Sequence, residues 1–337
     1  MRVFQIEGDW GMNNLKPSSR PKPEVGPGQV LVRMKASSLN FRDLLVPERG
    51  YGSHTGTLPL IPLSDGVGVV SDIGPGVRRV AVGDRVCPTY FQRWTSGEPD
   101  LERLTQSLGG PVDGTMAEYM CLSEEGVVKV PAYLTDIEAA TLPCAALTAW
   151  SALTICGKVK PGDRVLVQGC GGVALFALAF AKLLGAHVTV ISSSAERIER
   201  VKALGADAAV NYRTTPEWAK ATRDITSGRG YDFIFELGGE KTLPQSLRCI
   251  RPGGTVAMIG VLTGGAMAAS LGFVVTRQVR LQGVTVGHRD GFETMVRALE
   301  QHKIKPVVDR VFAFEELKEA MAHLKSGAQF GKVCISH

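Results

Sequence analysis

The chain has 337 residues, of which 44% are hydrophobic and 21% are charged, and it contains 39 glycines. This composition provides for a large buried core and predicts two domains, and it excludes a disordered tail or a coiled coil. The formal charge is +5 with both signs scattered along the chain, so nothing in the sequence indicates a nucleic-acid surface.

The longest apolar stretch, Gly172 to Leu184, is shorter than the roughly 20 residues that a bilayer span requires. Residues 1–10 lack the apolar segment and cleavage site of a secretory signal. We therefore expect a cytoplasmic protein without a membrane span. The 7 cysteines are widely spaced with no CxxC pair, which argues against a disulfide framework and against a structural zinc knot.

Residues 29–120 contain short β-branched runs separated by Gly and Pro, which predicts a compact antiparallel β domain. Within this region residues 90–114 show no strand or helix periodicity, so we expect a long surface lobe there. Residues 135–156 are predicted to be helical. Thr135 and Glu138 have the spacing of a capping box at the start of this segment.

From Asp163 onward, strands alternate with helices. Strands are expected at 163–168, 187–192, 207–211, 231–236 and 254–260, and helices at 172–186, 195–206, 217–226 and 241–249. Such alternation indicates right-handed crossovers and a parallel sheet with both faces covered. After a strand-like segment at 281–287, we expect a helix at 292–301, a strand at 306–314, a helix at 315–326 and a closing strand at 332–336.

A glycine-rich loop follows the first of these strands, with the sequence Gly169-Cys170-Gly171-Gly172-Val173-Ala174, and a helix begins directly after it. Glycine lets the backbone turn and approach a pyrophosphate, whose charge then meets free N–H groups at the helix N-terminus. The fold class predicted is therefore α/β, with a Rossmann doubly wound parallel sheet. The residues expected to bind a dinucleotide are Gly169, Gly171, Gly172 and Val173. A tight structural turn without a ligand is the alternative.

The end of the second strand predicts which dinucleotide is bound. Sites that prefer NAD place a carboxylate there for the ribose hydroxyls, but this strand ends in serines. The hydroxyls of Ser192 and Ser193 can donate to a 2′-phosphate and Arg197 can neutralise it, so the pattern favours NADP(H). Alternatively, Ser194 caps the next helix and Arg197 is a solvated surface charge, and both interpretations can hold at once.

The whole chain resembles the medium-chain dehydrogenase/reductase superfamily, and most closely its quinone oxidoreductase and zinc-independent alcohol dehydrogenase-like branch. The motifs that carry the resemblance are PGQVLVRMKASSLNFRD, DGVGVV from Asp65, GDRV at Gly83, LPCAALTAW at Leu142, the glycine loop and the closing FGKV. The resemblance implies a GroES-like catalytic domain of residues 1–124 and 288–337 and a Rossmann domain of residues 125–287.

In the zinc-containing members, three positions hold the catalytic metal, and the resemblance assigns Asn40, Ser64 and Cys144 to them. An amide and a hydroxyl are poor zinc ligands, and one thiolate does not fix a tetrahedral site. The lobe at 90–114 also lacks the cysteines of a structural zinc site. We therefore expect no metal, with Cys144 as a small buried residue facing the cofactor cleft.

Without a Lewis acid, a simple alcohol is difficult to ionise at neutral pH. Hydride addition to a conjugated acceptor requires less, because hydrogen-bond donors can stabilise the oxygen that receives the charge. We therefore predict an NADPH-dependent reductase of a quinone or an activated alkene or carbonyl, as the resembled branch implies. The alternatives are a metal-independent NADP-dependent alcohol or aldehyde oxidoreductase and a low-turnover NADPH-binding protein.

Three residues are candidate catalytic groups. Asn40 can donate its amide to the substrate oxygen from the former metal position. Tyr51 lies where the resembled quinone oxidoreductases carry an active-site tyrosine, and it can donate a hydrogen bond or a proton. Ser64 can add a hydroxyl to the pocket. Alternatively, Tyr51 is a loop residue packed for bulk and Ser64 fills the space of a lost ligand.

Several neighbouring residues complete the expected site. Leu45 replaces a second tyrosine of the resembled branch, and Asp43 is expected to form a structural ion pair rather than to act as an acid or base. Gly238, Gly260 and Val261 follow the fourth and fifth strands, whose ends should contact the cofactor. The resemblance implies that Lys332 touches the cofactor or the interdomain cleft and that His288 lies near the nicotinamide, with a surface lysine as the alternative for Lys332. By analogy we expect a homodimer, with the strand at 254–260 forming the sheet edge that pairs across it.

Overall fold

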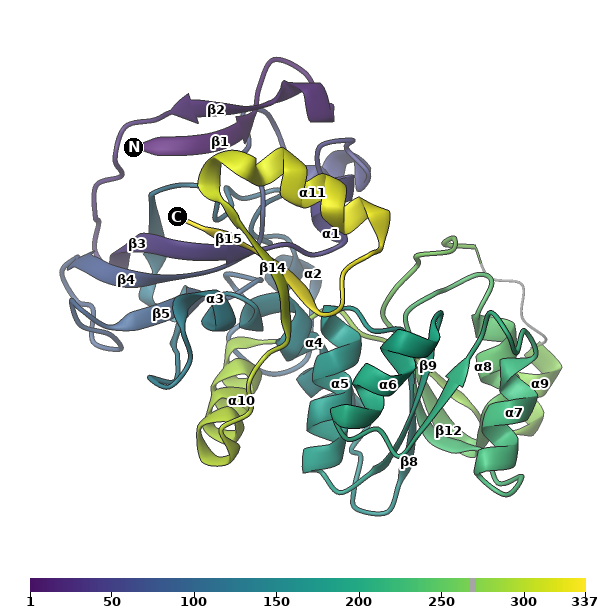
Figure 1. Cartoon of the computed structure of the whole chain (residues 1–337). Helices are drawn as coiled ribbons and strands as arrows, with labels where there is room; N and C mark the ends of the chain where they lie inside the picture. Colours follow the sequence, from purple (N-terminus) through teal and green to yellow (C-terminus); the bar gives the residue numbers. More distant parts are fainter. Residues whose placement is uncertain (267–270) are drawn as a thin grey trace. The chain divides into compact units, whose positions relative to one another are not determined.

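The computed structural model describes residues 1–266 and 271–337. The chain divides into two compact units, one of Met1–Leu147 with Val286–His337 and one of Thr148–Thr285 (Figure 1). The first boundary, expected after residue 124, therefore falls after residue 147. The reason is that the intervening residues pack within the first unit, where β7 (Val127–Lys129) pairs with β5 (Arg85–Pro88).

A seven-stranded sheet forms the centre of the first unit. With β5 and β7, its strands are β3 (Gln29–Ser38), β4 (Asp65–Ile73), β6 (Tyr119–Ser123), β14 (Val308–Ala313) and β15 (Lys332–Ser336). The order is β14-β15-β3-β4-β5-β7, with β6 also pairing with β3. All of these pairs are antiparallel except β14 with β15. The expected antiparallel β domain is therefore confirmed, and a separate hairpin of β1 (Arg2–Ile6) and β2 (Leu15–Ser19) adds to it.

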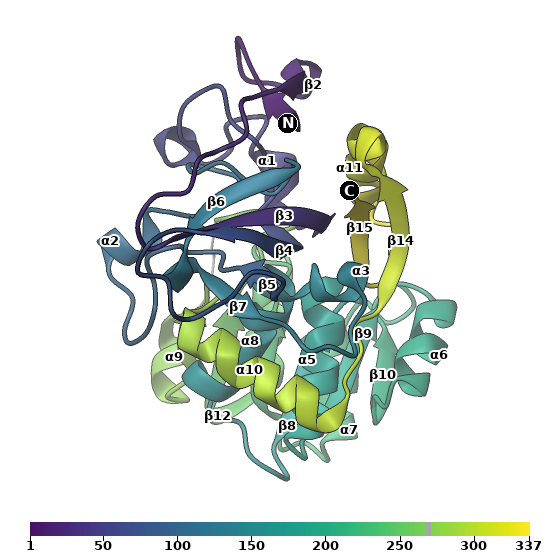
Figure 2. The ribbon, with the colours of Figure 1, turned by 90° about the vertical axis from the view of Figure 1, so that its left-hand side faces the viewer.

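The helices of the first unit are α1 (Arg42–Leu45), α2 (Leu101–Leu104), α3 (Asp136–Ala139), α10 (Arg289–His302) and α11 (Leu317–Ser326). Figure 2 shows α10 beside β7 and α11 beside β14 and β15, and these elements are in contact. The long helices therefore cover the sheet, whereas the short ones lie in its connections.

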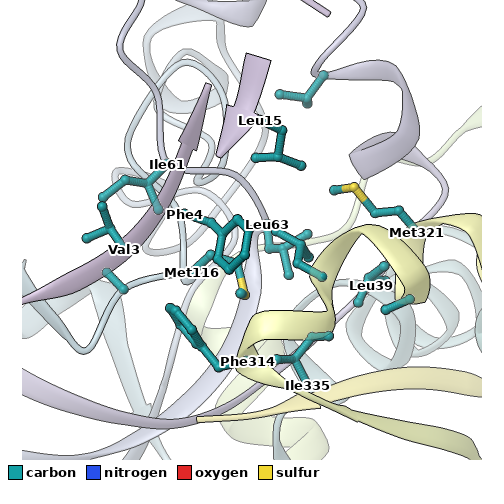
Figure 3. Close-up of a cluster of buried hydrophobic side chains, with 14 of the residues drawn as sticks. Val3, Phe4, Leu15, Leu39, Ile61, Leu63, Met116, Phe314, Met321 and Ile335 are labelled. Carbon is teal, nitrogen blue, oxygen red and sulfur yellow. The ribbon is translucent and has the colours of Figure 1, made fainter. Parts of the chain in front are cut away.

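The hydrophobic core of this unit gathers side chains from its N-terminal strand, its loops and α11. Figure 3 shows Phe4, Met116, Phe314 and Met321 within this cluster, and all four are buried. Leu39 and Leu63 belong to the same core. Leu39 directly precedes Asn40, and Leu63 directly precedes Ser64. Burial of each leucine therefore constrains the position of the predicted site residue that follows it.

The segment predicted as one helix at 135–156 is broken into shorter pieces. Its capping box is confirmed, since Thr135 Oγ1 accepts from the Glu138 N–H and the Glu138 carboxylate accepts from the Thr135 N–H. After α3 the chain forms π-helical turns at Leu142–Ala146 and Ser151–Cys156 around α4 (Leu147–Trp150). Within the expected surface lobe, only residues 96–102 are exposed throughout, whereas Tyr90, Trp94 and Leu108 are buried.

A six-stranded parallel sheet forms the centre of the second unit, in the order β10-β9-β8-β11-β12-β13. This order is that of the Rossmann doubly wound fold, which confirms the predicted class. The strands are β8 (Arg164–Gln168), β9 (His187–Ser192), β10 (Ala208–Asn211), β11 (Tyr231–Glu236), β12 (Ile250–Met258) and β13 (Arg280–Gly283). The helices are α5 (Gly172–Leu183), α6 (Ala195–Ala203), α7 (Trp218–Ile225), α8 (Leu243–Cys249) and α9 (Leu271–Thr276).

The expectation that residues 254–260 form the sheet edge is wrong. They belong largely to β12, which pairs with β11 on one side and with β13 on the other. The edge beside it is β13, whose four residues add one more parallel strand through the register Thr255 to Arg280 and Met258 to Gly283.

The apolar stretch at 172–184 forms α5, which has 12 residues. No helix within residues 1–266 and 271–337 combines the length and the apolarity of a bilayer-crossing segment.

Candidate functional site

The first unit brings Asn40 and Ser64 together, with Asn40 Nδ2 3.4 Å from Ser64 Oγ. Asn40 follows β3 and Ser64 precedes β4, and these strands pair with Ser38 opposite Asp65. Leu63, just before Ser64, has a φ of 67°. This left-handed conformation is strained for a bulky residue, by about 1–3 kcal/mol, and persists only where the surroundings hold it.

Glycines explain how Leu63 is held in this conformation. A Cβ on Gly114 would lie 2.0 Å from the Leu63 carbonyl oxygen, and a Cβ on Gly109 would lie 2.6 Å from the same oxygen. Because neither backbone could approach so closely with a side chain, these two glycines allow the loop at 109–114 to pack on Leu63. The packing in turn places the Ser64 hydroxyl.

Asp65 joins two of the three positions that the sequence analysis associated with a metal. The Ser64 hydroxyl donates to Asp65 Oδ1 at 2.7 Å, and the Cys144 N–H donates to Asp65 Oδ2 at 3.1 Å. Asp65 is fully buried, and burial raises the pKa of its carboxyl group. In the sequence, Asp65 is recognisable only as the start of the DGVGVV motif, and its connecting role was not predicted.

Lys332, at the start of β15, reaches the same cluster. Its side chain is 3% exposed, and Nζ donates to Asn40 Oδ1 and to the Leu39 carbonyl, each at 2.6 Å. Nζ also lies 3.9 Å from Asp65 Oδ2. The alternative of a surface lysine is therefore wrong, and Lys332 lies beside the first of the candidate catalytic residues.

Asp43 holds the backbone of Asn40, because the Asn40 N–H donates to Asp43 Oδ2 at 2.7 Å. Burial raises the pKa of Asp43 to about 6, against the opposing effect of Arg42, whose Nη1 lies 3.8 Å from Oδ1. Arg42 also donates to the carbonyls of Leu108 and Gly110 at 2.8 and 3.0 Å. The pair therefore positions backbone, in agreement with a structural ion pair.

Two further candidates have different surroundings. Tyr51 is 44% exposed, and the Arg42 guanidinium lies 5.9 Å from its ring centroid. Burial of part of the phenol raises the pKa of Tyr51. His288 is the N-cap of α10, where its Nδ1 accepts from the Gly291 N–H at 2.9 Å, and its ring lies edge-on to Trp94. His288 therefore has a structural role in its own unit.

In the second unit, the glycine loop joins β8 to α5. Gly169 has a φ of 78°, and a Cβ at Gly169 or Gly171 would have no neighbouring atom within 4 Å. Gly171 is the N-cap of α5, and this end has neither a side-chain cap nor an acidic residue in its first turn. An open cradle beside uncapped N–H groups fits the pyrophosphate of a dinucleotide. Gly172 and Val173 are in the first turn of α5.

The serines at the end of β9 have separate roles. Ser192 is 1% exposed, and its Oγ lies 3.1 Å from Cys170 Sγ, so it joins the strand end to the glycine loop. Ser194 caps α6 by accepting from the Arg197 N–H at 3.3 Å, which confirms the capping interpretation. Ser193 and Arg197 are half-buried. The pairing of Ser192 with Cys170 was not predicted.

The loops after β11 and β12 pack against each other. A Cβ on Gly260 would lie 2.2 Å from the Leu237 carbonyl oxygen, and a Cβ on Gly239 would lie 3.1 Å from Val261 Cα. Glu236, at the end of β11, accepts from the N–H groups of Gly238 and Gly239 at 3.1 and 3.0 Å. The structure therefore brings the predicted residues Gly238, Gly260 and Val261 together at the carboxyl end of the sheet.

Comparison with known proteins agrees with this arrangement. One family model, described as an alcohol dehydrogenase GroES-like domain, matches residues 26–132, and another, described as a zinc-binding dehydrogenase, matches residues 172–301. A Schizosaccharomyces pombe protein named zinc-type alcohol dehydrogenase-like protein is 42% identical over 332 residues, which cover 96% of each chain. The chain belongs to the medium-chain dehydrogenase/reductase superfamily.

Solved structures extend this result to the whole length of this medium-chain dehydrogenase/reductase. A Sinorhizobium meliloti 1021 protein matches with a TM-score of 0.93 and 42% identity, covering 100% of this chain and 98% of the other. An NAD-dependent alcohol dehydrogenase matches with a TM-score of 0.91 and 34% identity, covering 100% of both chains. The protein is thus an oxidoreductase of this family, whose members bind a nicotinamide cofactor, NAD or NADP.

Proposed function

We propose that the protein is an NADPH-dependent reductase that transfers hydride to a quinone or to an activated alkene or carbonyl without a catalytic zinc. The observation that carries this proposal is the orientation of the Asn40 amide. Its oxygen accepts from Lys332, so its nitrogen is left as a hydrogen-bond donor at the first of the three zinc positions. A donor at this point stabilises an oxygen that gains negative charge.

The residues at the three positions do not fit a zinc ion. The oxygen of Asn40 already faces an ammonium, and the Ser64 hydroxyl donates to Asp65. Cys144 is the one side chain of the three that zinc commonly binds, and a single thiolate does not fix a tetrahedral site. Among the described residues, no group of three or more His, Cys, Asp or Glu side chains could hold a metal ion.

The roles of the other residues follow from this proposal. When bound, the cofactor supplies the hydride. Gly171, Gly172 and Val173 hold the pyrophosphate of the cofactor through backbone N–H groups. Gly169 supplies the turn beside it, because its own N–H donates to the Ile191 carbonyl at 2.7 Å. Gly238, Gly260 and Val261 contact the cofactor from the neighbouring loops. Asn40 donates a hydrogen bond to the substrate oxygen, and the Ser64 hydroxyl oxygen accepts the other hydrogen of the amide nitrogen. Tyr51, with its raised pKa, is protonated at neutral pH and donates a hydrogen bond or a proton.

Preference for NADPH is supported by the end of β9, which carries no carboxylate to repel a 2′-phosphate. Ser193 and Arg197 are the recognising groups that we propose. Ser192 contributes through its position next to the glycine loop, since its hydroxyl is buried against Cys170.

A panel assay tests the proposal. NADPH and NADH oxidation is measured with quinones, enones and aldehydes, and the metal content is determined on the same sample. We expect turnover of quinones or enones with NADPH in protein that contains no stoichiometric zinc. Activity that a chelator abolishes and zinc restores would contradict it.

Two relatives, the zinc-type alcohol dehydrogenase-like protein and the NAD-dependent alcohol dehydrogenase, favour a second candidate function, oxidation of an alcohol. Alcohol-dependent reduction of NADP by chelator-treated protein would support a metal-independent alcohol or aldehyde oxidoreductase. NADPH binding without turnover of any acceptor or alcohol would support a low-turnover binding protein.

We also propose a homodimer. One edge of the second unit's sheet is β13, which pairs on one side with β12 and is largely exposed. Its other side is therefore available to pair with β13 of a second copy. Light scattering during size-exclusion chromatography should give twice the chain mass of 36.1 kDa. Leu281→Pro should reduce the measured mass to that of the monomer if β13 forms the interface.

A further inference from the structure

Lys332 is a buried cation whose hydrogen bonds converge on the two residues that follow β3. A buried ammonium group requires hydrogen-bond acceptors, because its transfer from water into the protein interior is very unfavourable without them. Two acceptors are the Leu39 carbonyl and Asn40 Oδ1, both at 2.6 Å, and the Asp65 carboxylate lies 3.9 Å away. One of the three groups around Lys332 is therefore the candidate catalytic amide itself.

The chemistry of an ammonium determines which way this amide faces. A lysine Nζ has only donors, so the Asn40 atom that faces it must be the oxygen. The amide nitrogen then faces away from Lys332, with one hydrogen directed to Ser64 Oγ at 3.4 Å. Ser64 can accept it because its own hydrogen is donated to Asp65. The Asn40 side chain also hydrogen-bonds toward the Asp65 carboxylate, which opposes the rise in the pKa of Asp65. The amide nitrogen carries two hydrogens, of which one is directed to Ser64.

We propose that Lys332 is a positioning residue, which fixes the Asn40 amide with its nitrogen toward the substrate oxygen and strengthens that hydrogen bond through its charge. The strengthening arises because hydrogen bonds in a chain polarise one another in a site of low dielectric constant. Without Lys332, the amide can rotate and present its oxygen, which would repel the developing negative charge. This inference rests on the proposed role of Asn40 as donor to the substrate.

Replacement of Lys332 by Met and by Gln separates orientation from bulk. Lys332→Met retains the length of the side chain but removes its donors, whereas Lys332→Gln retains one donor for Asn40 Oδ1. We expect kcat to fall about 10- to 100-fold in Lys332→Met, less than the loss of a complete oxyanion donor. KM for the acceptor should change little, and Lys332→Gln should recover part of the rate. If Lys332→Met fails to fold, the comparison is made with Lys332→Gln alone, which must then lose activity but less than Asn40→Ala.

A double-mutant cycle shows whether Lys332 acts through Asn40. In an Asn40→Ala background, Lys332→Met should cause almost no further loss of kcat. Additive losses would overturn the proposal. So would a raised Kd for NADPH with kcat retained at saturation, because that pattern is expected if Lys332 contacts the cofactor instead. The matched control is Lys182→Met, which removes a lysine on α5 that is paired with Asp207. This variant should leave kcat unchanged.

A spectroscopic measurement tests the positioning even if the protein reduces none of the acceptors. The chain has only four asparagines, Asn13, Asn14, Asn40 and Asn211, so ¹⁵N-asparagine labelling gives few side-chain amide signals. The Asn40 signal is assigned by its loss in Asn40→Ala. It should shift strongly in Lys332→Met and less in Lys332→Gln, and an unchanged signal in Lys332→Met would contradict the proposal. An inactive wild-type protein with these shifts would refute the proposed function alone.

Discussion

Glu236 Oε2 accepts a hydrogen bond of 2.8 Å from Gln168 Nε2, which joins the end of β11 to the end of β8. Both side chains are buried, and Gln168 Oε1 in turn accepts from the N–H groups of Leu237 and Gly238 at 3.0 and 3.2 Å. The hydroxyls of Thr242 and Ser246 also donate to Glu236. One carboxylate therefore organises the loop that follows β11, next to the strand that leads into the glycine loop.

Glu236→Gln should destabilise the protein although its shape is preserved. The five groups that hydrogen-bond to this carboxylate within the described residues are all donors, so the new amide nitrogen faces at least one N–H or O–H group. A buried donor without an acceptor costs about 1–3 kcal/mol. We expect this loss in urea unfolding, together with weaker dinucleotide binding. The exposed Glu196→Gln is the control, and equal stability of the two variants would show that the network is unimportant.

Gly171→Ala should weaken the cofactor complex without weakening the fold. The added Cβ meets no atom of the protein within 4 Å, and Gly171 does not have a positive φ. The methyl group instead occupies the space where a pyrophosphate approaches the N-terminus of α5. We expect the Kd for NADPH in a fluorescence titration to rise at least about tenfold, or 1.4 kcal/mol. The melting temperature should stay the same.

Gly283→Ala provides the comparison for that experiment, because its Cβ also enters open space but lies on β13. It should leave the Kd unchanged. Gly169→Ala should both weaken binding and destabilise the fold, since Gly169 has a φ of 78°. If Gly171→Ala binds NADPH as the wild-type protein does, the loop does not hold the pyrophosphate.

The sequence allowed the second unit to be predicted closely because buried parallel strands appear as continuous apolar runs. Its edge was not identified, because β13 has only four residues and three of them are exposed. The strand β2 was missed for a similar reason, since its residues LKPSS include a proline and are mostly exposed. In both strands the pairing is determined by tertiary contacts rather than by local pattern.

The site was predictable in part. Asn40 and Ser64 were identified from their motifs, but the contact of Asn40 with Lys332 depends on the pairing of β15 with β3, and these strands are almost 300 residues apart in sequence. One signal was present in the sequence: Lys332 directly precedes the apolar residues Val333, Cys334 and Ile335, and a lysine that begins a buried strand requires a partner. The role of Asp65 carried no comparable signal.

Arg197→Ala tests the choice between the two dinucleotides. A charge-assisted contact to the 2′-phosphate contributes about 1.5–3 kcal/mol, so its loss should weaken NADPH binding about 10- to 100-fold. NADH lacks this phosphate and should bind nearly as before. Lys202→Ala, on the same helix and paired with Glu199, is the control. Equal losses for both dinucleotides would leave the preference for NADPH without its basis.

Acid sensitivity of the first unit should depend on His337. Burial lowers the pKa of His337 to about 4, and its Nε2 lies 2.8 Å from Ser37 Oγ. Between pH 6.5 and about 4, the unfolded chain therefore binds a proton that the folded protein does not, and stability falls as the pH falls. The contribution lost between pH 8 and pH 5 is about 2 kcal/mol.

Asp43 acts in the opposite direction, because its raised pKa of about 6 means that the folded state takes up a proton at a higher pH than the unfolded chain does. The difference between the wild-type protein and His337→Gln isolates the histidine, since the Asp43 contribution is common to both. In urea unfolding from pH 8 to pH 5, His337→Gln should lose less stability than the wild-type protein by about this amount. Parallel pH profiles of the two proteins would show that His337 becomes protonated equally easily in the folded and unfolded states.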